Sequence, residues 1–220
     1  MKLGLISDIH GDLASLQAAL GLLQHQGAKR ILCMGDLVDK GPDGDAVVTL
    51  IRDLNIPCVR GNHDEDAYGN QFWMRNNADL TNPIVQERLL STETIDYLKN
   101  LPFLLRYEWG EAETKAVRIL VVHGTPFNNS EYLLTTSRAT FYQEIANMSE
   151  ADVILFGHTH TPMSAYFDNV WFFNPGAVLC LPPNDGFVQH HSCATLTLPE
   201  MTFTVFNITT GEKLDVVHLE

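Results

Sequence analysis

The chain has 220 residues, a formal net charge of −13 and four widely spaced cysteines. Its length suits one sizeable α/β domain and is short for two. The negative charge excludes a broad surface for long nucleic acids, and no apolar stretch approaches the ~18 residues of a membrane span. The apolar run from Leu3 to Ile6 ends at Ser7, too short for a signal peptide. We therefore expect one soluble, cytoplasmic domain, residues 1–220, with free thiols.

Short apolar runs alternate with helical patterns in the first part of the chain. Strands are predicted at Leu3–Ile6, Arg30–Met34 and Ile56–Arg60. Helices are predicted from the N-cap Asp12 to the stop at Gly27, and over Asp45–Leu54. This alternation predicts a largely parallel sheet whose loops meet at the carboxyl ends of its strands.

The segment 65–115 is polar, and we expect it to form a helical insertion or cap with a helix from Thr92. Strands are predicted at 116–122 and 153–156, with a helix between them that opens at Ser137 or Thr140. From residue 164 onward, short β-like runs joined by turn residues are typical of antiparallel strands. We therefore expect two sheets packed together.

Polar residues follow several of these strands directly, in the fragments Asp8-Ile9-His10, Gly35-Asp36, Gly61-Asn62-His63-Asp64, His123-Gly124 and Gly157-His158-Thr159-His160. In extended backbone, residues i and i+2 point the same way, so Asp8 pairs with His10, and His158 with His160. Carboxylate, amide and imidazole ligands without thiolate suit Mn²⁺, Fe, Co²⁺ or Zn²⁺ and disfavour a structural zinc site. The fragments therefore predict a metal site.

The ligands are too many for one tetrahedral ion and suit two ions that share a carboxylate. Asp36 is the expected bridge, because it alone among the acidic residues of these fragments follows a glycine at a strand end. Two divalent ions can deprotonate a bridging water, and the resulting hydroxide attacks a phosphoryl group. His63 is the expected general acid, with Asp39 or Asp64 fixing its tautomer.

In order and residue type, these fragments and Asp39 resemble the calcineurin-like metallophosphoesterases, and the short chain resembles their small bacterial and archaeal phosphodiesterase branch. The resemblance implies a four-layer α/β/β/α sandwich of two mixed sheets flanked by helices. It implies that Asp39 pairs with the proton donor His63. Mn²⁺ is the expected metal, with Fe, Zn²⁺, Ni²⁺ or Co²⁺ as alternatives. The implied ligand sets are Asp8, His10, Asp36 and His160 for one metal, and Asp36, Asn62, His123 and His158 for the other.

The predicted activity is hydrolysis of a small phosphodiester, and the alternative is hydrolysis of a diadenosine polyphosphate or another nucleotide. A protein phosphatase is less favoured, because Lys40 stands where those relatives usually carry arginine. A non-catalytic scaffold is weaker still, because no ligand is missing. In the nucleotide interpretation, Trp73 and Arg75 of the segment 65–115 contact the base. A homo-oligomer is a further hypothesis, with Phe127, Tyr132 and Phe187 as its contact surface.

Overall fold

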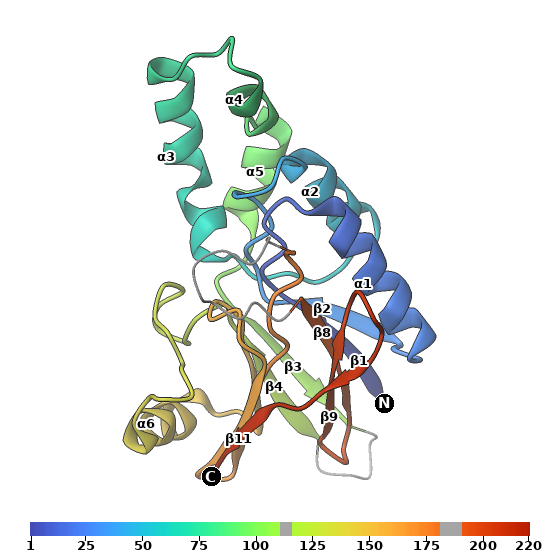
Figure 1. Cartoon of the computed structure of the whole chain (residues 1–220). Helices are drawn as coiled ribbons and strands as arrows, with labels where there is room; N and C mark the ends of the chain where they lie inside the picture. The colour runs from blue at the N-terminus through green and yellow to red at the C-terminus, as the bar shows by residue number, and fades with distance from the viewer. Residues whose placement is uncertain (111–115, 181–190) are drawn as a thin grey trace.

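The computed structural model describes residues 1–110, 116–180 and 191–220, and two mixed β-sheets form its centre (Figure 1). The first sheet has the strand order β10-β9-β8-β1-β2. Its strands are β1 (Lys2–Ile6), β2 (Arg30–Cys33), β8 (Ser192–Thr197), β9 (Thr202–Asn207) and β10 (Lys213–Leu214). The second sheet has the order β11-β6-β7-β5-β4-β3. Its strands are β3 (Leu105–Trp109), β4 (Val117–Val121), β5 (Val153–Leu155), β6 (Met163–Phe167), β7 (Val170–Asn174) and β11 (Val217–Leu219).

Alternating side chains on the strands build three apolar layers. In β1, Leu3 and Leu5 pack between the sheets, while Ile6 packs on the opposite face under the outer helices. In β4, Val121 points between the sheets and Leu120 points toward the outside of the second sheet. Both faces of these strands are therefore buried, which explains their nearly continuous apolar sequence.

Helices cover the two outer faces, which completes the predicted four-layer arrangement. Helices α1 (Leu13–His25) and α2 (Gly44–Asp53) pack on the first sheet, and α6 (Ala139–Ser149) packs on the second. The Asp12 side chain accepts a hydrogen bond from the Ser15 N–H at the start of α1, as its predicted N-cap role requires. Gly27 has a φ of +80° just after that helix.

The carboxyl-terminal strands do not form a sheet of their own. Strand β8 pairs antiparallel with β1, while β7 pairs parallel with β5. Each sheet thus contains both parallel and antiparallel pairs, and each combines strands from the first portion of the chain with strands from the last. The two mixed sheets confirm the predicted fold class, whereas the expectation that the first part of the chain is parallel and the last part antiparallel is wrong.

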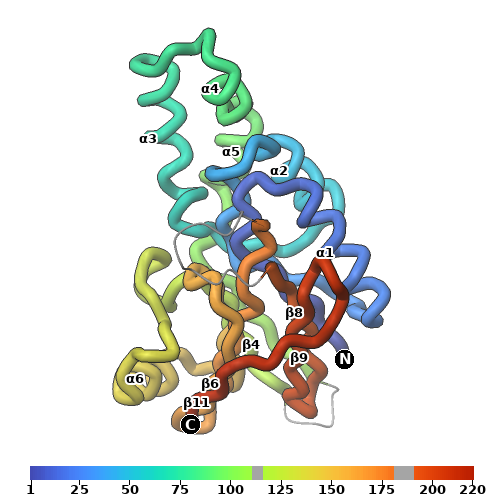
Figure 2. The backbone as a smooth tube through the Cα atoms, viewed as in Figure 1, coloured from blue at the N-terminus to red at the C-terminus, as the bar shows by residue number. Residues whose placement is uncertain are grey.

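Helices α3 (Asn62–Asn77), α4 (Pro83–Glu87) and α5 (Thr92–Asn100) stand beyond the ends of the sheets, at the top of Figures 1 and 2. We call these helices the cap. The predicted helical segment 65–115 is too long, because Leu105–Trp109 forms strand β3, paired antiparallel with β4. Residues 111–115 lie outside the described part of the chain.

The predicted strand Ile56–Arg60 is also wrong. Only an isolated parallel bridge joins Cys58 to Cys33. Pro57 has no N–H to donate, so this segment cannot extend a regular ladder beyond that bridge. Its chain still runs beside β2 and delivers Gly61 and Asn62 to the edge of the first sheet.

The two remaining expectations about the whole chain concern membranes and thiols. Among the described residues, no helix combines the length and apolarity that crossing a bilayer requires. All four cysteines are free, and Cys180 is the exposed one.

Candidate metal centre

The metal-ligand candidates gather where four strands end. Asp8 and His10 follow β1, Asp36 follows β2, His123 follows β4, and His158 and His160 follow β5. Asn62 is the first residue of α3. The structure therefore brings all seven predicted ligands to one edge of the sandwich.

The backbone that presents these side chains is unusual for residues other than glycine. Five of the candidates have φ values between 50° and 65°, in the left-handed region, namely Asp8, His10, Asp36, His158 and His160. Aspartate and histidine are among the residues that tolerate this region best.

Two glycines make room for the carboxylates. A Cβ atom on Gly61 would collide with Asp36 Oδ1, and a Cβ atom on Gly157 would collide with Asp8 Oδ2 and with Ser7. The glycines that precede Asn62 and His158 therefore allow two loops to approach the carboxylates closely. This explains why glycine opens both sequence fragments.

Asp36 lies between two groups of histidines. Its Oδ2 atom is 3.6 Å from His10 Nε2 and 3.3 Å from His123 Nε2. Its Oδ1 atom accepts a hydrogen bond from the His63 N–H, at 2.9 Å. The oxygen that faces both groups is thus Oδ2, the atom best placed to be shared.

The first group contains Asp8, His10 and His160, whose ligand atoms lie within 4.8 Å of one another. Asp8 Oδ1 is 3.2 Å from His160 Nε2, and the Nε2 atoms of the two histidines are 3.1 Å apart. His10 directs Nδ1 to the Val38 carbonyl oxygen, at 3.1 Å. Its Nε2 atom is thereby left facing the other candidates.

The second group contains Asp36, His123 and His158, again with ligand atoms within 4.8 Å of one another. His123 directs Nδ1 to the Met34 carbonyl oxygen at 2.6 Å, and its Nε2 atom lies 3.0 Å from Asn62 Oδ1. The His158 N–H donates to Asp8 Oδ2, at 3.0 Å. A main-chain hydrogen bond thus ties the second group to the first.

The chemistry of these atoms fits divalent cations. Within the described parts of the chain, His158 Nε2 is buried without a hydrogen-bond partner, and buried Asp8 Oδ1 has only its ionic contacts to His10 and His160. A buried polar atom left unsatisfied costs roughly 1–3 kcal/mol. A cation would satisfy both atoms. His10 and His123 each engage a main-chain carbonyl through Nδ1, which is how proteins orient metal-binding imidazoles.

The histidines differ in protonation when only protein groups surround them. Burial lowers the pKa of His10 to about 4, although Asp36 and Asp8 oppose it. Burial also acts to lower the pKa of His123, but the charge of Asp36 and its hydrogen bond prevail and raise it to about 10. A proton on His123 then supplies positive charge that a bound cation would replace.

His63 and Asp39 form a pair beside the metal-ligand candidates. His63 Nδ1 lies 2.7 Å from Asp39 Oδ2, and this hydrogen bond is the largest cause of a raised pKa for His63. A nitrogen of His63 lies within 4.8 Å of ligand atoms of His10 and Asp36. The His63 side chain is 29% exposed, whereas that of His10 is fully buried. His63 is therefore more accessible to a substrate than His10.

Asp64 anchors the loop that carries Asp36, and it does not contact His63. Its carboxylate accepts hydrogen bonds from the N–H groups of Asp36, Leu37 and Gly61, at 2.8 to 3.0 Å. Burial, followed by the charge of Asp36, raises its pKa to about 6. Of the two partners expected for His63, the structure thus pairs Asp39 with the ring and uses Asp64 to hold the backbone.

Replacing Asp64 with asparagine should lower the free energy of unfolding by about 2–4 kcal/mol, because an amide NH₂ would face main-chain donors and leave them unsatisfied. Urea denaturation at pH 7.5 measures the change. Asp66→Asn is the matched control, since Asp66 is exposed two residues later on the same helix. Equal unfolding midpoints for the two variants would contradict the anchoring role.

Lys40 reaches the same cluster. Its Nζ atom lies 3.0 Å from His10 Nε2, and burial lowers its pKa while Asp8 and Asp36 raise it. Burial is the larger effect, so the pKa of Lys40 lies below its ordinary value even with these carboxylates nearby.

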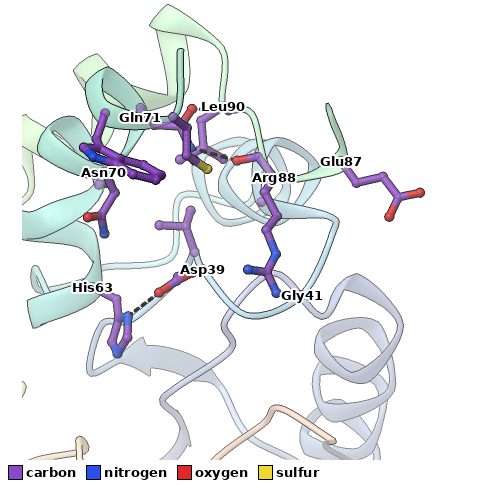
Figure 3. A pocket seen from close by; sticks show the side chains of 13 residues that line it. Asp39, Gly41, His63, Asn70, Gln71, Glu87, Arg88 and Leu90 are labelled. Carbon is purple, nitrogen blue, oxygen red and sulfur yellow. Dashed lines mark hydrogen bonds and ion pairs between the residues drawn. The ribbon is translucent and has the colours of Figure 1, made fainter. Parts of the chain in front are cut away.

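A cavity of about 190 Å³ opens beside the His63–Asp39 pair, between the cap and the loop 38–44 (Figure 3). Trp73 is among its lining residues, whereas Arg75 donates a hydrogen bond to the Leu90 carbonyl oxygen, at 2.6 Å, and so holds the cap together. The hypothesis that Arg75 contacts a nucleotide is therefore not favoured.

Tyr132 contributes to the site without having been predicted to do so. Its ring stacks on that of His158, with centroids 4.0 Å apart and an interplanar angle of 26°. No periodic pattern in its loop signals this contact. Tyr132 and Phe127 are exposed, whereas Phe187, the third residue of the expected oligomer surface, lies outside the described residues.

Comparison with known proteins identifies the family of this chain. Residues 1–201 match the model of the calcineurin-like phosphoesterase superfamily domain. The uncharacterized protein MJ0912 of Methanocaldococcus jannaschii is 29% identical over 209 residues, which cover 87% of this chain and 81% of that protein. Phosphodiesterase YfcE of Escherichia coli is 25% identical over 188 residues, which cover 81% of this chain and 79% of YfcE.

A solved structure also shares the fold. The hypothetical protein PH1004 of Pyrococcus horikoshii superposes with a TM-score of 0.74 at 20% identity. The match covers 94% of this chain and 87% of that one. At this identity the likeness concerns the fold alone.

Proposed function

Because this chain belongs to the calcineurin-like phosphoesterase superfamily, we propose that it is a metal-dependent phosphodiesterase with two divalent cations. The observation that carries the proposal is the position of Asp36 Oδ2, 3.6 Å from His10 Nε2 and 3.3 Å from His123 Nε2. One cation would be held by Asp8, His10, Asp36 and His160, and the other by Asp36, Asn62, His123 and His158.

When bound, the cations lower the pKa of a water so that it can attack phosphorus at neutral pH, and they offset charge on the phosphoryl oxygens. The protein's own groups supply the rest. Asp39 engages the Nδ1 atom of His63. The Nε2 atom of the same ring is therefore the one that donates a proton to the leaving oxygen. The hydrogen bond from the His63 N–H to Asp36 keeps this donor in register with the metal ligands.

The relative YfcE is named a phosphodiesterase. This name supports diesters rather than monoesters as the substrates of the present chain. Lys40 also favours a diester substrate, because a single ammonium cannot make the bidentate hydrogen bonds by which arginine binds a terminal phosphate. Hydrolysis of a nucleotide or a diadenosine polyphosphate is the second candidate function, and the cavity beside His63 is the observation that favours it.

Removal of divalent metal with a chelator should abolish turnover, because the ligand set provides no other source of a nucleophile at neutral pH. Restoring Mn²⁺ should bring back hydrolysis of bis(4-nitrophenyl) phosphate at a rate about tenfold or more above that of 4-nitrophenyl phosphate, since Lys40 offers only a single ammonium to the terminal phosphate of the monoester. Release of nitrophenol is measured with Mn²⁺, Ni²⁺, Zn²⁺, Co²⁺ and Fe²⁺ in parallel, and with a diadenosine polyphosphate as a third substrate.

Other outcomes point elsewhere. A preference for the monoester would contradict the phosphodiesterase, and turnover of the dinucleotide alone would favour the nucleotide hydrolase. Two bound metal ions with no hydrolysis of any substrate would favour a scaffold of the same fold.

A further inference from the structure

The cavity beside His63 and Asp39 has no role in the steps described above. It lies between one face of α3, the end of α4 and the loop 38–44 (Figure 3). If His63 protonates the leaving oxygen, the group bonded to that oxygen extends into this cavity. The part of the substrate that stays on phosphorus then lies toward the metal-ligand candidates. The cavity is thus placed to bind the leaving alcohol.

A single helix face joins the cavity to the proton donor. His63, Ala67, Asn70 and Met74 line the cavity and follow one another at steps of four, three and four residues along α3. Such spacing places side chains on one side of a helix. A group bound against this face is therefore held at a fixed position relative to the His63 ring.

The cavity is small, and part of its wall is apolar. Val38, Ala67 and Leu90 line it and are almost fully buried. A cavity of roughly 150 Å³ with apolar walls can bind benzene, and sites for drug-sized ligands begin at about 300 Å³. The volume of about 190 Å³ thus suits one planar ring system and is too small for a whole dinucleotide.

Two side chains at the cavity suit a nucleobase. Trp73 lines it and is 60% exposed, so its indole is available to stack on a ring. Asn70 lines the cavity and is exposed, and its amide offers both a donor and an acceptor to a base edge. Gln71, in contrast, is already engaged with the main chain of Arg88 and Leu90, at 2.8 and 2.9 Å.

The charge around the cavity narrows the choice of leaving alcohol. Arg88 extends from the cap toward Gly41, on the side of Asp39, whereas Glu87 points away from the cavity (Figure 3). No ion pair engages the Arg88 guanidinium within the described parts of the chain. The cavity therefore carries charges of both signs, and a leaving alcohol without net charge, such as a nucleoside, suits it.

We propose that this cavity binds the base of a leaving nucleoside, so that the substrates are phosphodiesters cleaved between phosphorus and a nucleoside oxygen. The proposal rests on the function proposed above. Water adds its oxygen to phosphorus, the bond from phosphorus to the nucleoside oxygen breaks, and the proton from His63 goes to that oxygen. The products are a free nucleoside and a phosphomonoester.

Adenosine 5′-methyl phosphate tests which side leaves, because its two ester bonds give different products. The proposal expects adenosine and methyl phosphate, separated by liquid chromatography. Release of AMP and methanol would overturn it, since the nucleoside would then remain on the phosphorus side.

Variants on the cap test the cavity directly. Trp73→Ala should raise the KM for adenosine 5′-methyl phosphate about 5- to 100-fold, the range expected for loss of one base–aromatic stack. Phe72→Ala is the matched control, because Phe72 is 63% exposed on the same helix and does not line the cavity. Asn70→Ala and Asn76→Ala form a second pair of the same kind. Equal KM values within each pair would overturn the proposal.

Binding of adenosine, measured by titration calorimetry with and without Mn²⁺, separates this proposal from the function on which it rests. Adenosine should bind the wild type and the Phe72→Ala variant equally, and Trp73→Ala at least fivefold more weakly. Hydrolysis of bis(4-nitrophenyl) phosphate without adenosine binding would overturn the cavity proposal and leave the phosphodiesterase standing. Adenosine binding that depends on Trp73, with no ester hydrolysed, would overturn the leaving-group role together with the enzyme function.

Discussion

Replacement of Asp36 with alanine should reduce turnover of bis(4-nitrophenyl) phosphate on the order of 10³-fold or more and leave fewer than two metal ions per chain. Its Oδ2 atom faces both groups of histidines, so both cations would lose a ligand at once. Loss of a single preorganised electrostatic contact already costs about 10²–10³ in rate. Stopped-time assays of nitrophenol release and elemental analysis of dialysed protein measure the two effects.

Two further variants test whether misfolding, rather than loss of metal, causes the lower turnover of Asp36→Ala. Asp36→Asn keeps an oxygen for the His63 N–H and should fold, yet it should still lose metal. Asp43→Ala lies in the same loop, and Asp43 makes no side-chain hydrogen bond as the N-cap of α2, so its activity should match the wild type. Full turnover by Asp36→Ala would refute the mechanism.

Replacement of His63 with alanine should lower kcat by about 10²–10⁴, the range for loss of a general acid, while two metal ions stay bound. The loss should be largest for esters of alkyl alcohols, because an alkoxide cannot leave without a proton. It should be much smaller for 4-nitrophenyl esters, because nitrophenolate leaves unprotonated. Rate constants for a set of leaving groups, together with metal analysis, check this pattern.

The control for His63 is His25→Ala, an exposed histidine at the end of α1. Asp39→Asn should give an intermediate loss with the same leaving-group trend, because Asp39 acts through the His63 ring. An equal loss for all leaving groups in His63→Ala would show that the ring binds substrate or metal and transfers no proton.

Strands buried on both faces were predictable from the sequence. The runs around Leu3–Ile6 and 153–156 are continuously apolar, because they pack between the sheets on one side and under helices on the other. Strand β3 was missed, although Leu105–Trp109 alternates apolar and charged residues. That segment was grouped with the polar residues before it.

The ligand candidates were predictable for a physical reason. Each follows a recognisable strand or opens a helix, and strand ends in an α/β fold meet at one edge. The cavity was not predictable as a whole, because Val38, Leu90 and Arg88 come from separate segments that only tertiary packing brings together. Its α3 face, with steps of three and four residues from His63, did carry a signal. Residues of the cap line this cavity.

The backbone is left-handed at five ligand candidates, namely Asp8, His10, Asp36, His158 and His160. This conformation lowers the stability of the protein at the positions that its proposed activity needs. Each such conformation in a residue with a Cβ atom costs on the order of 1 kcal/mol or more, and glycine would relieve that cost. A glycine there would also remove the ligand. Selection for thermal stability alone would therefore favour glycine at these five positions. An inactive descendant of this fold would be recognisable by glycines in these turns.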